Sequence, residues 1–197
     1  MPADRSPNVV WQQHAERNQR WAALGHGGAT LWMTGLPGSG KSTVAAGVEA
    51  QLLGQGRSTY VLDGDNLRHG LNGDLGFSAE DRAENVRRTA EVSALLADAG
   101  VVVLVALVSP YRADRDAARA VHAARGLPFL EIHVATSLDE CERRDPKGLY
   151  ARARAGEISG LTGVDDPYEP PEAPEVVVGL GDGVAADVGR VLAALPG

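Results

Sequence analysis

Short apolar runs alternate along this chain with longer segments in which apolar side chains recur every three or four positions. The apolar runs predict buried strands at 30–34, 58–62, 101–108, 129–134 and 175–178. The helical spacing predicts helices at 12–24, 41–53, 78–99, 114–125, 138–144 and 184–195. Eight consecutive apolar residues at 101–108 are typical of a central parallel strand that is covered on both faces.

The alternation of strands and helices predicts an α/β fold in three layers, with an open, mostly parallel sheet between two layers of helices. In such sheets, ligands bind at the carboxyl ends of the strands. Residues 145–175 are rich in proline, glycine and charge, and we expect them to form a lid. We therefore divide the chain into an N-terminal helical segment, 1–28, and a main domain, 29–197, that includes this lid.

Length and charge narrow the possible functions. A chain of 197 residues suits one domain, and no apolar run reaches the ~18 residues of a membrane span. The first residues lack the apolar run of a signal peptide and there is one cysteine, so we expect a cytoplasmic protein. The net charge of −7 lies in residues 155–197, which carry eight acidic residues against one arginine. A neutral body with an acidic end argues against nucleic-acid binding.

A glycine-rich motif follows the first predicted strand. Residues 35–42, Gly-Leu-Pro-Gly-Ser-Gly-Lys-Ser, match the pattern G-x-x-x-x-G-K-[ST] between a strand and a helix. Glycines let backbone N–H groups surround a phosphate, and the helix N-terminus adds positive potential. Lys41 is a compact charge suited to the β- and γ-phosphates, and the Ser42 hydroxyl is suited to Mg²⁺. The motif predicts a P-loop nucleoside triphosphatase fold and leaves the phosphate acceptor open.

A second polar motif follows the second predicted strand. Residues 63–68 read Asp-Gly-Asp-Asn-Leu-Arg, so two carboxylates lie close to the same edge of the sheet. One carboxylate can hold Mg²⁺ or its water, and the other can accept a proton from an attacking hydroxyl. Asp63 is assigned the Mg²⁺-linked or base role and Asp65 the acceptor side, although the two roles are interchangeable on sequence alone. A simple Asp-Gly turn is the alternative.

Taken together, six motifs resemble the adenylylsulfate kinase (APS kinase) family. The two motifs above are followed by Phe-Ser-Ala-Glu-Asp-Arg-Ala-Glu-Asn-Val-Arg-Arg at 77–88 and Ser-Pro-Tyr-Arg at 109–112. Asp-Pro-Lys-Gly-Leu-Tyr at 145–150 and Thr-Gly-Val-Asp-Asp-Pro-Tyr-Glu at 162–169 complete the set, and 8–11 resembles the family's N-terminal segment. The resemblance implies transfer of the γ-phosphoryl group of ATP, with Mg²⁺, to the 3′-hydroxyl of adenosine 5′-phosphosulfate (APS), as in sulfate assimilation. The products are ADP and 3′-phosphoadenylyl sulfate (PAPS).

The resemblance also implies roles for individual residues. The catalytic set is Lys41, Asp63, Asp65 and Ser109, and Mg²⁺ is assigned to Ser42 and Asp63. The ATP side comprises Gly35, Leu36, Pro37, Gly38, Ser39, Gly40, Lys41, Ser42, Thr43 and Arg144. The APS side comprises Asp65, Asn66, Arg68, Phe77, Arg82, Asn85, Ser109, Pro110, Lys147, Gly160 and Leu161.

Several of these residues have alternative interpretations. Phe77 either stacks on the acceptor adenine or packs as a hydrophobic staple on the following helix, and the resemblance favours stacking. Ser109 matches a position described in bacterial relatives as an active-site phosphoserine, whereas direct in-line transfer requires no covalent intermediate. Leu161 replaces a phenylalanine that is common in the family, so we expect APS binding weakened by ~1 kcal/mol. Lys41 and Lys147 are the only lysines beside 17 arginines, and we expect arginine at either position to damage turnover.

Two other functions compete with APS phosphorylation. The first is another P-loop kinase, with a nucleoside monophosphate or a sugar as its acceptor, and the second is a nucleotide-binding switch without useful transfer. A switch needs no second substrate site, so the acceptor-side residues argue against it. The resemblance further implies a homodimer and a pathway partnership with the ATP sulfurylase that makes APS.

Overall fold

The computed structural model describes Val10, Gln12 and the ranges 14–179 and 181–196. Its strands are β1 (Ala29–Thr34), β2 (Thr59–Asp63), β3 (Val102–Ala106), β4 (Phe129–Val134) and β5 (Val176–Val178). Its helices are α1 (Arg17–Leu24), α2 (Lys41–Gly54), α3 (Gly64–Leu67), α4 (Ala79–Asp98), α5 (Arg112–Ala123), α6 (Leu138–Arg144), α7 (Leu149–Arg154) and α8 (Val184–Ala194). Of the segment 8–11, only Val10 is described.

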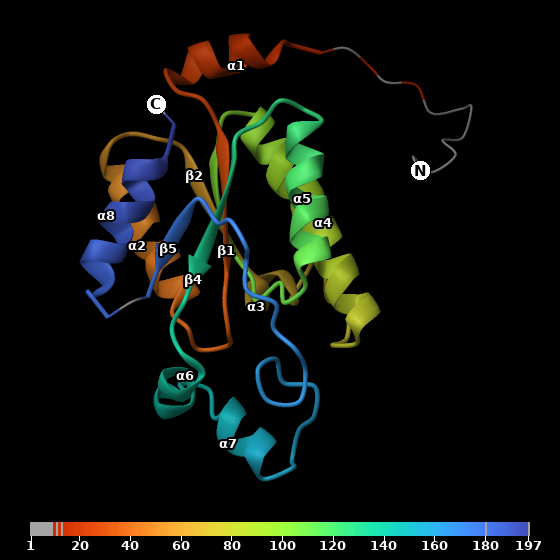
Figure 1. The fold of residues 1–197 in the computed structure, drawn as a ribbon. Helices are drawn as coiled ribbons and strands as arrows, with labels where there is room; N and C mark the ends of the chain where they lie inside the picture. The colour runs from red at the N-terminus through yellow and green to blue at the C-terminus, as the bar shows by residue number, and fades with distance from the viewer. Residues whose placement is uncertain (1–9, 11, 13, 180, 197) are drawn as a thin grey trace.

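The five strands form one sheet in the order β2-β3-β1-β4-β5, and each neighbouring pair is parallel. Helices α2 and α8 cover one face of this sheet and helices α4 and α5 cover the other (Figure 1). The predicted three-layer α/β fold is confirmed. Because all strands run in the same direction, the residues that follow β1, β2 and β3 meet at one edge of the sheet.

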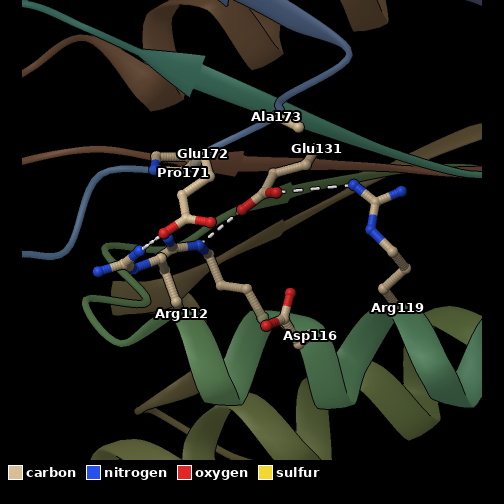
Figure 2. A pocket seen from close by; sticks show the side chains of 8 residues that line it. Arg112, Asp116, Arg119, Glu131, Pro171, Glu172 and Ala173 are labelled. Atoms are coloured by element: carbon tan, nitrogen blue, oxygen red, sulfur yellow. Dashed lines mark hydrogen bonds and ion pairs between the residues drawn. The ribbon is translucent and has the colours of Figure 1, made fainter.

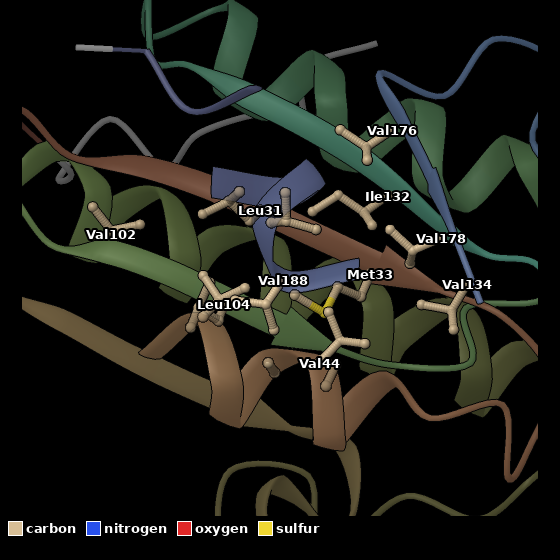
Figure 3. Packing of buried hydrophobic residues seen from close by; sticks show 14 of the residues in the cluster. Leu31, Met33, Val44, Val102, Leu104, Ile132, Val134, Val176, Val178 and Val188 are labelled. Carbon is tan, nitrogen blue, oxygen red and sulfur yellow. The ribbon is translucent and has the colours of Figure 1, made fainter. Parts of the chain in front are cut away.

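Alternate residues of the strands fill two separate cores. Leu31, Met33 and Leu104 point toward α2 and α8, where they pack with Val44 and Val188 (Figure 3). The intervening residues of the same strands pack against α4 and α5 in a second core, which comprises Trp32, Val103, Val105, Val86, Ala90 and Ala94 among others. Both faces of β1 and β3 are therefore buried, which explains the uninterrupted apolar run of β3.

The lid is more ordered than the sequence indicates. Residues 145–175 contain α7, and α6 and α7 lie beyond the carboxyl ends of the strands (Figure 1). Cys141, Tyr150 and Leu161 are buried together in a third apolar cluster that belongs to this region. The composition of 145–175, rich in proline and glycine, gave no sign of α7, because a helix of six residues is stabilised by tertiary packing more than by its own sequence.

Element ends follow local chemistry closely. The Ser78 hydroxyl accepts a hydrogen bond from the Asp81 N–H at 3.2 Å and so caps the N-terminus of α4, close to the predicted start of this helix at residue 78. Gly25 ends α1 in the left-handed conformation that glycine favours, so the predicted end at residue 24 is confirmed, whereas α1 begins at Arg17 rather than at residue 12. Strand β3 ends at Ala106, two residues before the end of its apolar run. In the described part of the chain, helices fall short of the combined length and apolarity that a membrane crossing requires.

Candidate active site

The P-loop connects the centre of the sheet to α2. Gly35 follows β1 with φ of 155°, and a Cβ added there would lie 2.6 Å from the Val134 carbonyl oxygen. Gly40 precedes α2 with φ of 105°, a conformation that glycine adopts without steric cost. The backbone therefore forms the expected cradle at the N-terminus of α2, where N–H groups and the helix dipole favour an anion.

Two residues outside the predicted site residues hold this loop in place. The Thr136 hydroxyl donates to the Ser39 carbonyl at 2.8 Å, and the Tyr150 hydroxyl donates to the Pro37 carbonyl at 2.9 Å. Thr136 follows β4 and Tyr150 lies on α7, so the loop is anchored by two distant segments. Tyr150 lies within a motif that carries the resemblance, which was the only sequence signal for it.

Lys41 points into the P-loop rather than into solvent. Its Nζ donates to the carbonyl oxygens of Gly35 and Leu36 at 2.9 and 2.8 Å. Burial disfavours the charged ammonium and lowers the pKa of Lys41 from 10.5 to about 8. The ammonium is thus held where a polyphosphate would bind, and pairing with the phosphate charge would stabilise its charged form.

This lowered pKa predicts that nucleotide binding weakens in alkaline solution. Below pH about 8, Lys41 is charged in both the free and the nucleotide-bound protein. Above that pH the free protein loses the proton, while phosphate charges raise the pKa of the bound form, so binding must take up a proton. We expect the ADP affinity, measured by calorimetry, to fall up to about tenfold per pH unit above pH 8. A constant affinity from pH 7 to 9.5 would contradict this linkage.

Ser42 and Asp63 meet across the sheet edge. The Ser42 hydroxyl donates to Asp63 Oδ2 at 2.6 Å, and Asp63 Oδ1 caps α3 by accepting from the Asp65 N–H at 2.9 Å. A hydroxyl and a carboxylate are hard oxygen ligands, which suit Mg²⁺ or its bound water. The structure brings together the two residues that the sequence assigned to the metal.

The lid reaches the sheet edge through Lys147. Its ammonium forms an ion pair with the Asp65 carboxylate at the start of α3. These two residues are 82 positions apart in the chain, and both belong to the predicted acceptor side. Asn66 lies beside Asp65 on α3. The segment 145–175 therefore contacts the start of α3, beside the carboxyl end of β2.

Phe77 and Arg68 form an exposed stacking surface. The Arg68 guanidinium lies over the Phe77 ring at 4.1 Å and donates to the carbonyl oxygens of Leu75 and Gly76. The Phe77 residue is 66% exposed and belongs to neither core, which argues against the hydrophobic staple. A ring with one face covered by a cation and much of its surface exposed is suited to stacking on a base.

Arg82 joins the first turn of α4 to the loop that follows α7. It donates to Thr162 Oγ1 at 2.8 Å, to the Gly160 carbonyl at 2.5 Å and to the Phe77 carbonyl at 3.0 Å. One turn further along α4, buried Asn85 accepts from the Asn72 amide at 2.7 Å through its Oδ1. Among the residues that the structure describes, Asn85 Nδ2 makes no hydrogen bond, so this amide group is suited to donate to a ligand. Nothing in the sequence gave a reason to select Asn72, because this residue lies between two motifs and its link to the site is the hydrogen bond to Asn85.

The turn after β3 places Ser109 in the interior. Ser109 has a φ of 39°, is 4% exposed, and accepts through Oγ from Trp32 Nε1 at 3.1 Å. The Pro110 carbonyl accepts from the Glu169 N–H at 2.9 Å. A hydroxyl bonded to a core indole is suited to fixing the turn, which favours the direct hydrogen-bonding role over the covalent one.

Arg144 ends α6, and Leu161 lies within the predicted lid. The Arg144 guanidinium pairs with Glu140 at 2.7 Å and lies 4.0 Å from the position that a Cβ of Gly40 would take, beside the P-loop. Leu161 is 9% exposed and packs with Cys141 and Tyr150. The expected weakening of APS binding by Leu161 stays a prediction. Among the described residues, no group of three or more potential metal-ligating His, Cys, Asp or Glu residues is found.

Comparisons with known proteins agree on one family. Residues 27–179 match the family model of adenylylsulphate kinase. The chain is 55% identical to an adenylyl-sulfate kinase of Shewanella amazonensis, over 89% of this chain and 88% of that protein. It is 51% identical to that of Clostridium acetobutylicum, over 88% and 86%.

A solved structure extends this similarity to three dimensions. The Mycobacterium tuberculosis APS kinase CysC, in complex with AMPPNP and APS, is 54% identical with a TM-score of 0.83. The matched region covers 85% of this chain and 96% of that one. The family model and the shared identity cover most of the chain, and the chain belongs to the adenylylsulphate kinase family.

Proposed function

We propose that this protein transfers the γ-phosphoryl group of ATP to the 3′-hydroxyl of APS, giving PAPS and ADP. The observation that carries the proposal is the ion pair between Lys147 of the lid and Asp65. It joins two groups of the predicted acceptor side, a carboxylate and an ammonium from segments 82 positions apart, and this supports a second substrate site beside the P-loop. Relatives at 51–55% identity bear the same activity in their names.

On the ATP side, the chain supplies charge and orientation. The P-loop N–H groups and Lys41 bind the β- and γ-phosphates, and Lys41 exchanges its bonds to Gly35 and Leu36 for phosphate oxygens. When bound, Mg²⁺ would neutralise charge on the β- and γ-phosphates, and Ser42 and Asp63 would hold it. Arg144, at the end of α6, lies beside the P-loop and would cover this side.

On the acceptor side, the side chains match an anionic nucleotide. Arg68, Arg82 and the Asn85 amide donors suit the phosphosulfate and ribose oxygens, and Phe77 suits the adenine. Asp65 would orient the 3′-hydroxyl and accept its proton, while Lys147 would leave Asp65 for the transferring phosphoryl group. Asp63 already accepts hydrogen bonds from the Ser42 hydroxyl and the Asp65 N–H, which leaves the Asp65 carboxylate as the one that faces the acceptor side.

A panel of acceptors tests this assignment against its competitors. With ATP and Mg²⁺, we expect kcat/KM for APS to exceed that for AMP or gluconate by at least about 10³-fold, because neither competitor offers the phosphosulfate oxygens that Arg68, Arg82 and Asn85 would bind. The measurement is ADP release for each acceptor at equal enzyme concentration. A preference for AMP or gluconate would identify a different small-molecule kinase. Tight ADP binding without turnover on any acceptor would identify a switch.

Three further properties stay predictions. The homodimer predicts a mass near twice 20.6 kDa by light scattering. A partnership with the ATP sulfurylase that makes APS follows from the need for this substrate, and the single cysteine supports a cytoplasmic location.

A further inference from the structure

Three arginines of α5 face the segment that returns from the lid to β5. Arg112 pairs with Glu172, Arg115 pairs with Glu131 at 2.6 Å, and Arg119 pairs with Glu175 at 2.7 Å. We call this group, Arg112, Arg115, Arg119, Glu131, Glu172 and Glu175, the α5 clasp. Figure 2 shows Arg112 directed at Glu172 and Arg119 directed at Glu131 around a cavity of about 380 Å³.

The cavity is neutral and its charges are already matched. Its lining holds three arginines and three acidic residues, the latter being Asp116, Glu131 and Glu172. Each guanidinium already has a carboxylate within 4 Å, so an external anion would have to displace one. The clasp therefore joins two parts of the chain rather than forming a ligand site.

Arg115 differs from the other two arginines in its burial and its partners. Its side chain is 1% exposed, compared with 44% for Arg112 and 35% for Arg119. It donates through Nε to Glu131, through Nη1 to the Ser109 carbonyl at 2.7 Å and through Nη2 to the Glu169 carbonyl at 2.7 Å. One guanidinium thus joins α5 to β4, to the turn after β3 and to the end of the lid.

The Ser109 contact fixes an unusual backbone conformation. Ser109 is one of two non-glycine residues with positive φ in the described part of the chain. Such a conformation persists only where the surroundings hold it. The Ser109 carbonyl is held by Arg115 and by Thr34 Oγ1 at 3.3 Å, while its hydroxyl is held by Trp32.

The Glu169 contact carries the same restraint into the acceptor side. The Glu169 N–H donates to the Pro110 carbonyl while its own carbonyl accepts from Arg115, so the lid's return is fixed at both backbone groups. Three residues earlier, Asp166 lies 3.6 Å from Arg82. A shift of the return segment would therefore move the loop that Arg82 binds.

We propose that Arg115 is a positioning residue for the acceptor substrate. Its guanidinium holds the Ser109-Pro110 turn and the segment around Glu169 in fixed positions relative to each other, without touching the substrate itself. This inference rests on the proposed function, because the Ser109-Pro110 turn and the segment around Glu169 both lie on the side that is assigned to APS.

The test compares Arg115→Lys with Arg119→Lys in steady-state assays with APS and ATP. Lysine keeps the charge but reaches one of the three partners, so we expect Arg115→Lys to raise the KM for APS about tenfold or more. The KM for ATP should change less than twofold, because the P-loop is held by Thr136 and Tyr150 instead. Arg119 bonds neither Ser109 nor Glu169, so Arg119→Lys should leave both constants within twofold of wild type.

A second variant covers the case in which Arg115→Lys fails to fold. Replacing both members of the buried pair, Arg115→Met with Glu131→Leu, leaves no unpaired buried charge and commonly preserves folding. It should show the same selective rise in the KM for APS. Equal effects on both substrates, or no effect in a folded variant, would overturn the role of Arg115. Absence of APS-dependent turnover in the wild type would instead contradict the proposed function and, with it, the positioning role.

Discussion

Replacing Lys41 with arginine is expected to lower kcat by about 10²- to 10³-fold, although the positive charge is kept. The Lys41 Nζ fits between two carbonyl oxygens 2.8 and 2.9 Å away in a buried pocket. The planar guanidinium is larger and cannot rotate among phosphate oxygens as a compact ammonium does. Steady-state kinetics with saturating ATP and APS measure the effect.

Lys147→Arg provides the matched comparison for this prediction. Lys147 is exposed and pairs with one carboxylate, so a guanidinium has room there. We expect damage to turnover that is smaller than at Lys41, with an unchanged melting temperature in both variants. A Lys41→Arg variant with wild-type kcat would show that only charge matters in the P-loop, which the geometry contradicts.

Replacing Asp63 with asparagine is expected to lower kcat by about 10²-fold or more and to raise the Mg²⁺ concentration needed for half-maximal rate. The amide keeps an oxygen to cap α3 but loses the negative charge that faces Ser42. Because the cap survives, the fold and the position of α3 should be retained. A Mg²⁺ titration of the initial rate measures the change.

Asp65→Asn is the control that separates the metal role from the acceptor role. Asp65 does not contact Ser42, so its replacement should lower kcat without shifting the Mg²⁺ requirement. A shifted requirement in Asp65→Asn and not in Asp63→Asn would exchange the two assignments that the sequence left open.

The fold was predictable where local chemistry and burial agree. The limits of β4 and α6 coincide with the predicted ranges, because each apolar or amphipathic run ends at a turn or capping residue. The end of β3 and the helix α7 were not predictable. Val108 continues the apolar run, but the chain already turns there toward Ser109, and α7 depends on burial of Tyr150 against Cys141.

The candidate site was predictable where residues lie in motifs, and not where residues act through others. Ser42 and Asp63 come from two different motifs and were both assigned to Mg²⁺. In the structure, Ser42 Oγ lies 2.6 Å from Asp63 Oδ2. Asn72, Thr136 and Arg115 carry no motif of their own. Their importance follows from contacts across 13, 97 and 54 positions of the chain, which only the folded structure brings together.

Identification of the product formed from APS tests the central claim most directly. The protein is incubated with ATP, Mg²⁺ and APS, and released ADP is compared with the nucleotide product by mass spectrometry and ³¹P NMR. We predict one ADP for each molecule of APS that gains a phosphate on the 3′-oxygen, and no ADP release without APS. ADP release by the folded protein that is independent of APS, or phosphate at another position, would contradict the account.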